Sequence, residues 1–174
     1  MSIFKQTKPS GKLVSGTTQQ QAYDIEKECL TLLERNYECT CGMNVRHFPV
    51  ILSCDDEACT FKLTDCGFEV FDNRHNTYFF SYITDYERQV DCIIQNLKKN
   101  NIYHLDIHPA AKEYGRNICI KDGILSLIDF DVAAIGTDFW PPKLQVLYNR
   151  ILLPGKDYYE SLKEHLLNYK TSMP

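Results

Sequence analysis

The segment YHLDIHPAAKEYGRNICIKDGILSLIDFD, residues 103–131, places two aspartates directly after two short apolar strands. Asp106 follows the first strand and Asp129 follows the second. Between them, two apolar runs flank Asp122-Gly123, the kind of dipeptide that most strongly favours a two-residue β-hairpin turn. The turn folds the second strand back along the chain, so both carboxylates are expected at one end of a small sheet.

Outside this segment, apolar residues at helical spacing predict several helices. Two of them have the sequence pattern of a capping box at their start, formed by Thr18 with Gln21 and by Thr84 with Glu87. The expected helices cover residues 19–35, 85–99, 142–151 and 157–169.

The remaining apolar runs are shorter and are bounded by turn residues, which indicates strands. Residues 47–56 and 58–67 are expected to pair as antiparallel strands around an acidic turn, and the second strand ends at Gly67. Residues 2–5 and 102–106 are also strand-like. The order of strand, helix, strands, helix, hairpin and helices predicts an α+β fold, because it does not alternate as repeated βαβ units do.

Length and composition indicate one globular domain that spans residues 1–174. The net charge of −4 implies no broad basic face, so nucleic acid is not expected as a partner. No apolar run approaches the roughly 18 residues of a membrane span. The N-terminal MSIFKQTKPSGK has no apolar signal core. An intracellular, cytoplasmic protein without a membrane partner is therefore expected.

The chain is rich in cysteine, at positions Cys29, Cys39, Cys41, Cys54, Cys59, Cys66, Cys92 and Cys119. Several lie in apolar periodic segments, where a thiol acts as a small hydrophobic side chain, so buried free thiols are the first expectation. A zinc site of Cys39, Cys41, Cys54 and Cys59 is the second, although its spacings differ from the usual C-x2-C knuckles. A disulfide framework is the third, because the number of cysteines is even.

The order of polar residues in 103–131 fits the chemistry of phosphoryl transfer. This reaction needs a carboxylate beside the attacking hydroxyl group and oxygen ligands for Mg²⁺. Asp106 offers such a carboxylate, and Asn117 and Asp129 offer hard oxygen atoms. The hairpin between Asn117 and Asp129 is expected to bring these groups together.

In these motifs the sequence resembles the protein-kinase-like superfamily. The usual catalytic loop there is H-R-D-x-x-x-x-N and the metal motif is D-F-G. This chain has HLD at 104–106, Asn117, and DFD at 129–131, and its HLDIHP and LIDFD are similar to the small-molecule kinases of the superfamily. The resemblance implies that Asp106 is the catalytic base and that Asn117 and Asp129 bind Mg²⁺.

The resemblance extends upstream, over roughly residues 2–135. The family has a strand lysine, as in V-A-I-K, that pairs with a helix glutamate. Lys5 in SIFK and Glu26 in the first helix are similar to that pair, which implies that they place the phosphates of ATP. The segment LTDCG resembles the hinge that meets adenine with backbone groups, which implies nucleotide binding at Asp65, Cys66 and Gly67.

Some family parts are reduced at both ends of the chain. With Lys5 in the place of the family lysine, no sequence precedes it for a glycine-rich loop, and GKLVSG at 11–16 is the candidate substitute. Few residues follow the DFD motif, and no A-P-E is present. The expected fold is a protein-kinase-like bilobal domain with a reduced N-lobe at about 1–67 and a truncated C-lobe at about 68–174.

The catalytic segment itself also departs from the family pattern. Residues 107–116 separate Asp106 from Asn117, where the motif has four residues. His108 stands where protein kinases usually have a lysine, and we interpret it as a local hydrogen-bonding residue. Asp131 replaces the glycine of D-F-G and is a candidate third carboxylate near the metal.

Two functions remain open from these motifs. The first is a minimal kinase that uses ATP and Mg²⁺ and transfers the γ-phosphate to a hydroxyl group of a protein Ser/Thr or of a small molecule. The alternative is a weak or inactive pseudokinase that binds a regulatory protein partner. If the chain is of viral or pathogen origin, the host cytoplasm is the expected location.

Overall fold

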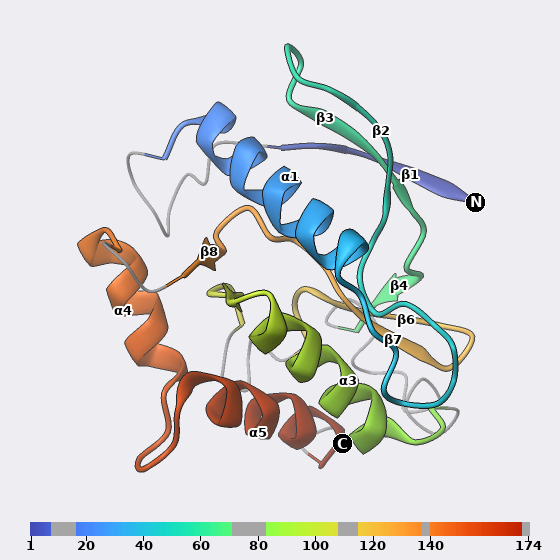
Figure 1. Ribbon diagram of the computed structural model, residues 1–174, viewed down its shortest axis with the longest axis vertical. Helices are drawn as coiled ribbons and strands as arrows, with labels where there is room; N and C mark the ends of the chain where they lie inside the picture. Colours follow the sequence, from blue (N-terminus) through green and yellow to red (C-terminus); the bar gives the residue numbers. More distant parts are fainter. Residues whose placement is uncertain (8–16, 71–82, 108–114, 137–139, 172–174) are drawn as a thin grey trace.

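The computed structural model describes residues 1–7, 17–70, 83–107, 115–136 and 140–171. In these ranges it is a mixed α and β structure with small antiparallel sheets, which confirms the predicted α+β class (Figure 1). The helices are α1 (Gln19–Arg35), α3 (Tyr86–Lys99), α4 (Pro142–Ile151) and α5 (Tyr158–Thr171). The strands are β1 (Ser2–Gln6), β2 (Ile51–Asp55), β3 (Thr60–Thr64), β4 (Phe68–Glu69), β5 (Ile102–Tyr103), β6 (Ile118–Lys121), β7 (Ile124–Leu127) and β8 (Ala134–Ile135).

The first sheet has the order β1-β3-β2 and is antiparallel throughout. The β2–β3 pair confirms the predicted acidic turn, in which Asp55 Oδ1 accepts a hydrogen bond from the backbone N–H of Glu57 at 3.1 Å. Along β1, Lys5 lies opposite Phe61 of β3. Helix α1 lies beside this sheet (Figure 1), and its Tyr23 stacks on Phe61 with ring centroids 4.5 Å apart. This packing sets the distance between β1 and α1.

The two helix starts turn out differently from each other. At α1 the capping box is present, because Thr18 Oγ1 accepts from the Gln21 N–H at 3.1 Å and Gln21 Oε1 accepts from the Thr18 N–H at 2.9 Å. At α3 the predicted box of Thr84 and Glu87 is wrong. The cap there is Asp85, whose backbone is left-handed (φ 52°) and whose side chain makes no capping bond. Thr84 therefore lies one residue before the cap position and does not cap the first turn of α3.

The hairpin of β6 and β7 forms as the sequence predicts. Asp122 and Gly123 have φ values of 51° and 78°, the two left-handed positions that a type I′ turn requires. Helix α3 fixes this turn through Gln89, which accepts from the Leu125 N–H and donates to the Gly123 carbonyl, both at 2.8 Å. Strand β4 extends the hairpin into a second antiparallel sheet of order β4-β6-β7.

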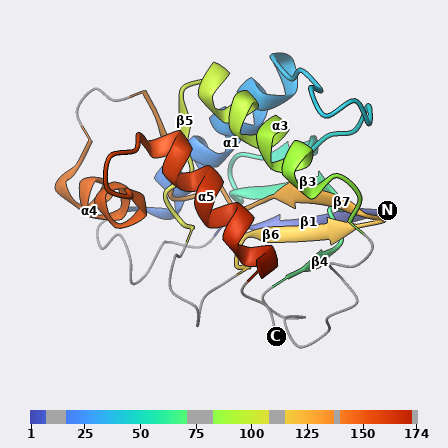
Figure 2. The ribbon, with the colours of Figure 1, turned by 90° about the horizontal axis from the view of Figure 1, so that it is seen from below.

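Helix α5 packs against α3, and the two lie side by side in both ribbon views (Figures 1 and 2). Two of its tyrosines reach the chain that leads to Asp106. Tyr158 donates its hydroxyl hydrogen bond to the His104 carbonyl at 2.7 Å, and Tyr159 donates to the Ile102 carbonyl at 3.2 Å. The predicted C-terminal helices are thus confirmed, and α5 holds β5 and the strand end before Asp106 in place.

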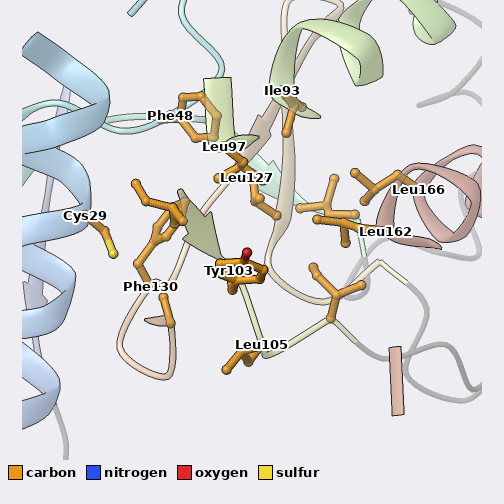
Figure 3. Close-up of a cluster of buried hydrophobic side chains, with 14 of the residues drawn as sticks. Cys29, Phe48, Ile93, Leu97, Tyr103, Leu105, Leu127, Phe130, Leu162 and Leu166 are labelled. Atoms are coloured by element: carbon orange, nitrogen blue, oxygen red, sulfur yellow. The ribbon is translucent and has the colours of Figure 1, made fainter. Parts of the chain in front are cut away.

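The hydrophobic core draws buried side chains from the four helices and from β3, β5, β6, β7 and β8. Figure 3 shows its side chains gathered around Tyr103, with Cys29 on the side of α1 and Leu162 on the side of α5. Phe130 is fully buried in this core and contacts Phe48 and His104, with ring centroids 6.0 and 4.7 Å away. Burial of a phenylalanine in this position anchors the backbone on either side of it, including Asp129.

Candidate functional site

Lys5, Glu26 and Asp129 come together, although Lys5 and Asp129 are 124 positions apart in the sequence. Lys5 Nζ lies 2.7 Å from both carboxylate oxygens of Glu26, and it also contacts Asp129 Oδ1. Strand β1 supplies the lysine, α1 supplies the glutamate, and the segment after β7 supplies the aspartate. Two acidic residues predicted from the sequence, Glu26 and Asp129, therefore both contact the ammonium group of Lys5.

Burial sets the charge states in this cluster. Glu26 is 0% exposed, and this burial raises its pKa, although the Lys5 ammonium acts in the opposite direction. Burial also acts to lower the pKa of Lys5, but the attraction of Glu26 and Asp129 outweighs it and holds that pKa above its ordinary value. Lys5 is therefore a cation at neutral pH, held in one place by two acids.

The backbone after Asp129 is fixed by the same glutamate. Glu26 Oε1 accepts a hydrogen bond from the Phe130 N–H at 3.2 Å. Asp129 itself has a left-handed backbone (φ 67°), which a residue other than glycine adopts only when its surroundings hold it there. The buried Phe130 ring and the Glu26 hydrogen bond are such restraints. They direct the Asp129 side chain to Lys5.

Asp106 and Asn117 form the second part of the site. The Asn117 side-chain amide donates from Nδ2 to the Asp106 carbonyl at 2.8 Å and to Asp106 Oδ2 at 2.9 Å. Asn117 also has a left-handed backbone (φ 62°), a conformation that asparagine tolerates better than most residues. The two residues are in direct contact despite the long insertion between them.

Ile128 connects this pair to the lysine cluster. Its carbonyl accepts from His104 Nε2 at 2.8 Å, and its N–H donates to the Asn117 carbonyl at 2.9 Å. Burial lowers the pKa of His104, so the ring is a neutral hydrogen-bonding group. His104 lies two residues before Asp106, Asn117 contacts Asp106, and Ile128 is adjacent to Asp129. The two aspartates therefore belong to one constellation, as the hairpin predicts.

A cavity of about 150 Å³ lies at the lysine cluster and Asn117, and Asp106 is not among the residues that line it. Its polar lining comes from Lys5, Glu26, Glu69, Asn117 and Asp129. The other residues that line it are Ile3, Pro49, Leu63, Cys66, Gly67, Cys119 and Ile128. A second cavity, of about 540 Å³, is lined by Ile3 and Gly67 as well, so the two adjoin. Together they offer a polar end at Lys5 and a largely apolar extension.

The predicted hinge residues are placed differently from one another. Cys66 and Gly67 line the smaller cavity, whereas Asp65 lines only the larger one. The Asp65 carboxylate accepts from the Gly67 N–H at 2.9 Å and from Lys121 Nζ, also at 2.9 Å. These bonds tie the segment to β6, so Asp65 acts as a brace and its side chain is not the group that faces Lys5.

Gly67 lies so close to β6 that no side chain fits. Its φ of +91° is in the left-handed range, and an added Cβ atom would lie 2.2 Å from the Ile120 carbonyl oxygen. We expect Gly67→Ala to lower the free energy of unfolding by about 3 kcal/mol, as measured by urea denaturation, because strain and a backbone clash add. Gly155→Ala is the matched control, since Gly155 also has positive φ (+75°) but has open space around it. An equal loss in both variants would contradict the close approach.

Glu69 is a site residue that the sequence reasoning missed. It follows the hinge segment in β4, lines the smaller cavity, and accepts the Asn117 backbone N–H at 2.8 Å. A two-residue strand has no periodic pattern that could point to it.

The carboxyl group of Asp131, two residues after Asp129, has a pKa well above its ordinary value. Burial raises the pKa of Asp131 to about 7; repulsion by Asp129, Glu26 and Asp106 adds to this, and Lys5 acts against it. In the unfolded chain an aspartate has its ordinary pKa of about 4. Between about pH 4 and 7 the unfolded state therefore releases a proton that the folded state retains, and stability falls as pH rises through this range.

Asp131→Asn should remove this pH dependence. We expect the variant to gain stability relative to the wild type between pH 5 and 7.5, as measured by denaturant titration without added Mg²⁺. Asp91→Asn is the control, because Asp91 forms an exposed ion pair with Lys163. If the free energies of unfolding of wild type and variant differ by the same amount at pH 5 and at pH 7.5, Asp131 ionises normally in the folded protein.

The cysteines differ from the predicted zinc set. All eight are free thiols, and most are buried, in line with the first expectation. Cys54 is exposed on β2, and Cys59 donates from Sγ to Gln20 Oε1 at 3.3 Å. A joint site of these two with Cys39 and Cys41 is therefore wrong, because the turn between β2 and β3 directs them elsewhere. Cys39 and Cys41 instead approach Cys92.

Two further candidates fall outside the described residues. These are GKLVSG at 11–16 and His108. Within the ranges that the structure does describe, no helix combines the length and apolarity that crossing a bilayer requires.

Comparisons with known proteins add no relative to this picture. No protein-family model matches the chain, and no curated protein is significantly similar to it in sequence. Its function is therefore inferred from the geometry described above and from the sequence motifs.

Proposed function

We propose that this protein is an ATP- and Mg²⁺-dependent phosphotransferase with a protein-kinase-like bilobal fold, reduced in the N-lobe (about 1–67) and truncated in the C-lobe (about 68–174). The observation that supports this most is the contact of Lys5 with both Glu26 and Asp129. A strand lysine, a helix glutamate and the aspartate of a D-F-x motif meet in this way in the family that the sequence resembles.

Lys5 would meet the phosphate groups of ATP. Its ammonium group is braced by Glu26, so it would stay in place if Asp129 exchanged its contact with Lys5 for a metal ion. A preorganised cation stabilises the charge of a transferring phosphoryl group without reorganisation cost. Glu26 is then a positioning residue, because it acts on the nucleotide only through Lys5.

The donor atoms present fit Mg²⁺, which prefers hard oxygen ligands. Asp129 offers carboxylate oxygens. Asn117 directs its NH₂ group to Asp106, so its amide oxygen is the atom suited to a metal. When bound, Mg²⁺ would supply positive charge that offsets the charge of the phosphates.

Asp106 would accept the proton of the acceptor hydroxyl. The amide of Asn117 and the packing of His104 hold the strand end on which Asp106 lies. A carboxylate fixed in this way can orient the hydroxyl oxygen toward the γ-phosphate, so rate enhancement would come from positioning and charge stabilisation. The acceptor would be a protein Ser/Thr or a small molecule of the cytoplasm.

With its phosphates at Lys5, the nucleotide would extend along the two adjoining cavities, and its base would lie away from Lys5. Ile3 and Gly67 line both of them, and Cys66 and Cys119 line the smaller one. Apolar walls with a few polar groups are typical of small-molecule sites. The backbone of residues 65–67 is then the edge at which adenine would find hydrogen-bonding partners.

The test is the melting temperature of the protein with ATP, in the presence and absence of Mg²⁺. At 100 times the dissociation constant, ATP·Mg²⁺ should stabilise the native state by about 2.7 kcal/mol and raise the melting temperature by about 5–10 °C. Asp129→Asn should lose the Mg²⁺-dependent part of the shift, and Asp24→Asn on the exposed face of α1 should keep it.

Two results would separate the proposal from its alternatives. Absence of any Mg²⁺-dependent shift in the wild type would contradict binding of ATP·Mg²⁺ at this site. A normal shift combined with no phosphoryl transfer to any hydroxyl acceptor would instead favour the pseudokinase, a regulatory module that binds nucleotide and a protein partner.

A further inference from the structure

Three thiols and one imidazole converge outside the site described above. Cys39 Sγ lies 3.4 Å from Cys41 Sγ, and Cys41 Sγ lies 3.5 Å from His47 Nε2. The sulfur atoms of Cys39, Cys41 and Cys92 all lie within 4.8 Å of one another. We propose that these four residues bind one Zn²⁺ ion in a closed, structural Cys₃His site.

The separations at Cys41 match those of tetrahedral zinc, and the ion would draw His47 closer to the other sulfur atoms, because its ring nitrogen is not within 4.8 Å of all three. Zn–S bonds of about 2.3 Å and Zn–N bonds of about 2.0 Å place neighbouring ligand atoms roughly 3.5–3.8 Å apart in a tetrahedron. The distances of 3.4 and 3.5 Å at Cys41 are close to this value. A disulfide would instead need sulfur atoms about 2.05 Å apart, and Cys39 and Cys41 are free thiols. Thiolate and imidazole donors together favour zinc among the common cellular metals.

His47 is oriented as a metal ligand is. Its ring is 0% exposed, and its Nδ1 lies 2.6 Å from the Leu125 carbonyl oxygen. A carbonyl can only accept, so Nδ1 carries the proton and Nε2 presents its lone pair to Cys41. Metal-binding histidines are typically fixed in this way by a hydrogen bond from the other ring nitrogen.

Backbone amides surround the sulfur atoms. The Thr40 N–H donates to Cys92 Sγ at 3.4 Å. Gly42 and Asn44 have left-handed backbones, with φ of 79° and 53°, which curl the loop around Cys41. Since a Cβ atom at position 42 would touch nothing, glycine is there for its backbone and not for space. N–H groups directed at sulfur stabilise thiolate, the form that binds metal.

The proposed ion would join parts of the chain that are distant in sequence. Cys39 and Cys41 lie in the loop after α1, His47 lies just before β2, and Cys92 lies on α3. With four protein ligands and no open position, the site would be structural and not catalytic. It would fasten the C-terminal end of α1, and with it the helix that carries Glu26, to α3. The inference does not depend on the proposed phosphotransferase activity.

The test is the metal content of the full-length protein, purified without chelator under reducing conditions. We expect about one zinc per chain by mass spectrometry. Replacement of zinc by Co²⁺ should give the intense visible absorption and the sulfur-to-metal charge-transfer bands of tetrahedral thiolate coordination. Binding of the ion to the apo protein should release thiol protons, and removal of zinc should lower the melting temperature by about 10 °C.

Variants identify the ligands. Cys92→Ser and His47→Gln should each weaken zinc binding by more than about 100-fold, since even loss of a residue that only supports a ligand costs 10–100-fold. Cys92→His should retain binding, because histidine is also a ligand. Cys59→Ser is the matched control, as Cys59 is buried but lies at Gln20 and should not affect zinc.

Three results would overturn the proposal. The first is a reduced wild-type protein that neither contains zinc nor takes up Zn²⁺ or Co²⁺. The second is an octahedral Co²⁺ spectrum, and the third is equal loss of zinc in Cys59→Ser and Cys92→Ser. Because the Co²⁺ measurement uses the wild-type chain, it tests the zinc site even if a variant fails to fold.

Discussion

Replacement of Asp106 by asparagine should reduce phosphoryl transfer by a factor of about 10²–10⁴, the usual contribution of a positioned general base. The change keeps the shape of the side chain. The hydrogen bond that Asp106 Oδ2 accepts from Asn117 at 2.9 Å can persist, because an amide oxygen also accepts. The variant should therefore fold and bind ATP·Mg²⁺ as the wild type does, and only the transfer step should fail. Transfer is measured with radiolabelled ATP and a panel of protein and small-molecule acceptors.

The control for this variant is Asp24→Asn, which makes the same chemical change on the exposed face of α1. It should leave both ATP binding and transfer unchanged. If Asp106→Asn transfers phosphate at the wild-type rate, Asp106 is not the base. A loss of ATP binding in that variant would show that Asp106 belongs to the nucleotide site and not to the acceptor site.

Lys5→Met should be the most destabilising single change among the charged residues of the site. Glu26 is 0% exposed, and Lys5 is the cation that compensates its charge. Removal of one partner from a buried ion pair leaves the other charge buried and unpaired, at a cost of about 3–5 kcal/mol. We expect a loss near the lower limit, about 3 kcal/mol, because the Lys5 side chain is 24% exposed. Urea denaturation at pH 7 measures it, and ATP binding should be lost as well.

Two comparisons make this prediction specific. Lys27→Met removes the partner of Asp56 in a surface pair whose side chains are 35% and 62% exposed, and it should destabilise the protein far less than Lys5→Met, because solvent screens an exposed pair. The double variant Lys5→Met/Glu26→Gln should recover part of the stability, because the unpaired carboxylate is gone. A Lys5→Met protein as stable as the wild type would mean that Glu26 does not need this cation.

Local patterns predicted the parts of the fold that local physics determines. The Asp122-Gly123 turn, the capping box of Thr18 and Gln21, and the helical spacing of α1 each depend on residues close in sequence. Part of the candidate site is predictable in the same way, because Asn117 and Asp129 flank a hairpin that the sequence predicts. Lys5, Glu26 and Asp129 are each predicted from the sequence as site residues, and their contact requires β1, α1 and the segment after β7 to pack together.

Features that depend on distant contacts could not be predicted. The strands β4 and β8 have two residues each, too few for a periodic pattern. Helix α3 starts at Tyr86, one residue after the predicted start, because Asp85 adopts a left-handed backbone. The thiol cluster was missed in part, because Cys92 comes from a helix far from Cys39 along the chain, whereas the zinc set considered from the sequence grouped Cys39 and Cys41 with Cys54 and Cys59.

The most direct test of nucleotide binding is covalent labelling with an acyl-phosphate derivative of ATP, which transfers its acyl group to a lysine beside the bound phosphates. The labelled peptide is identified by mass spectrometry, with and without excess ATP·Mg²⁺. We predict modification of Lys5 that ATP·Mg²⁺ prevents, and no such protection at Lys27, which lies on the outer surface of α1. Labelling that leaves Lys5 unmodified, or that ATP·Mg²⁺ does not reduce, would contradict a phosphate site at Lys5, Glu26 and Asp129.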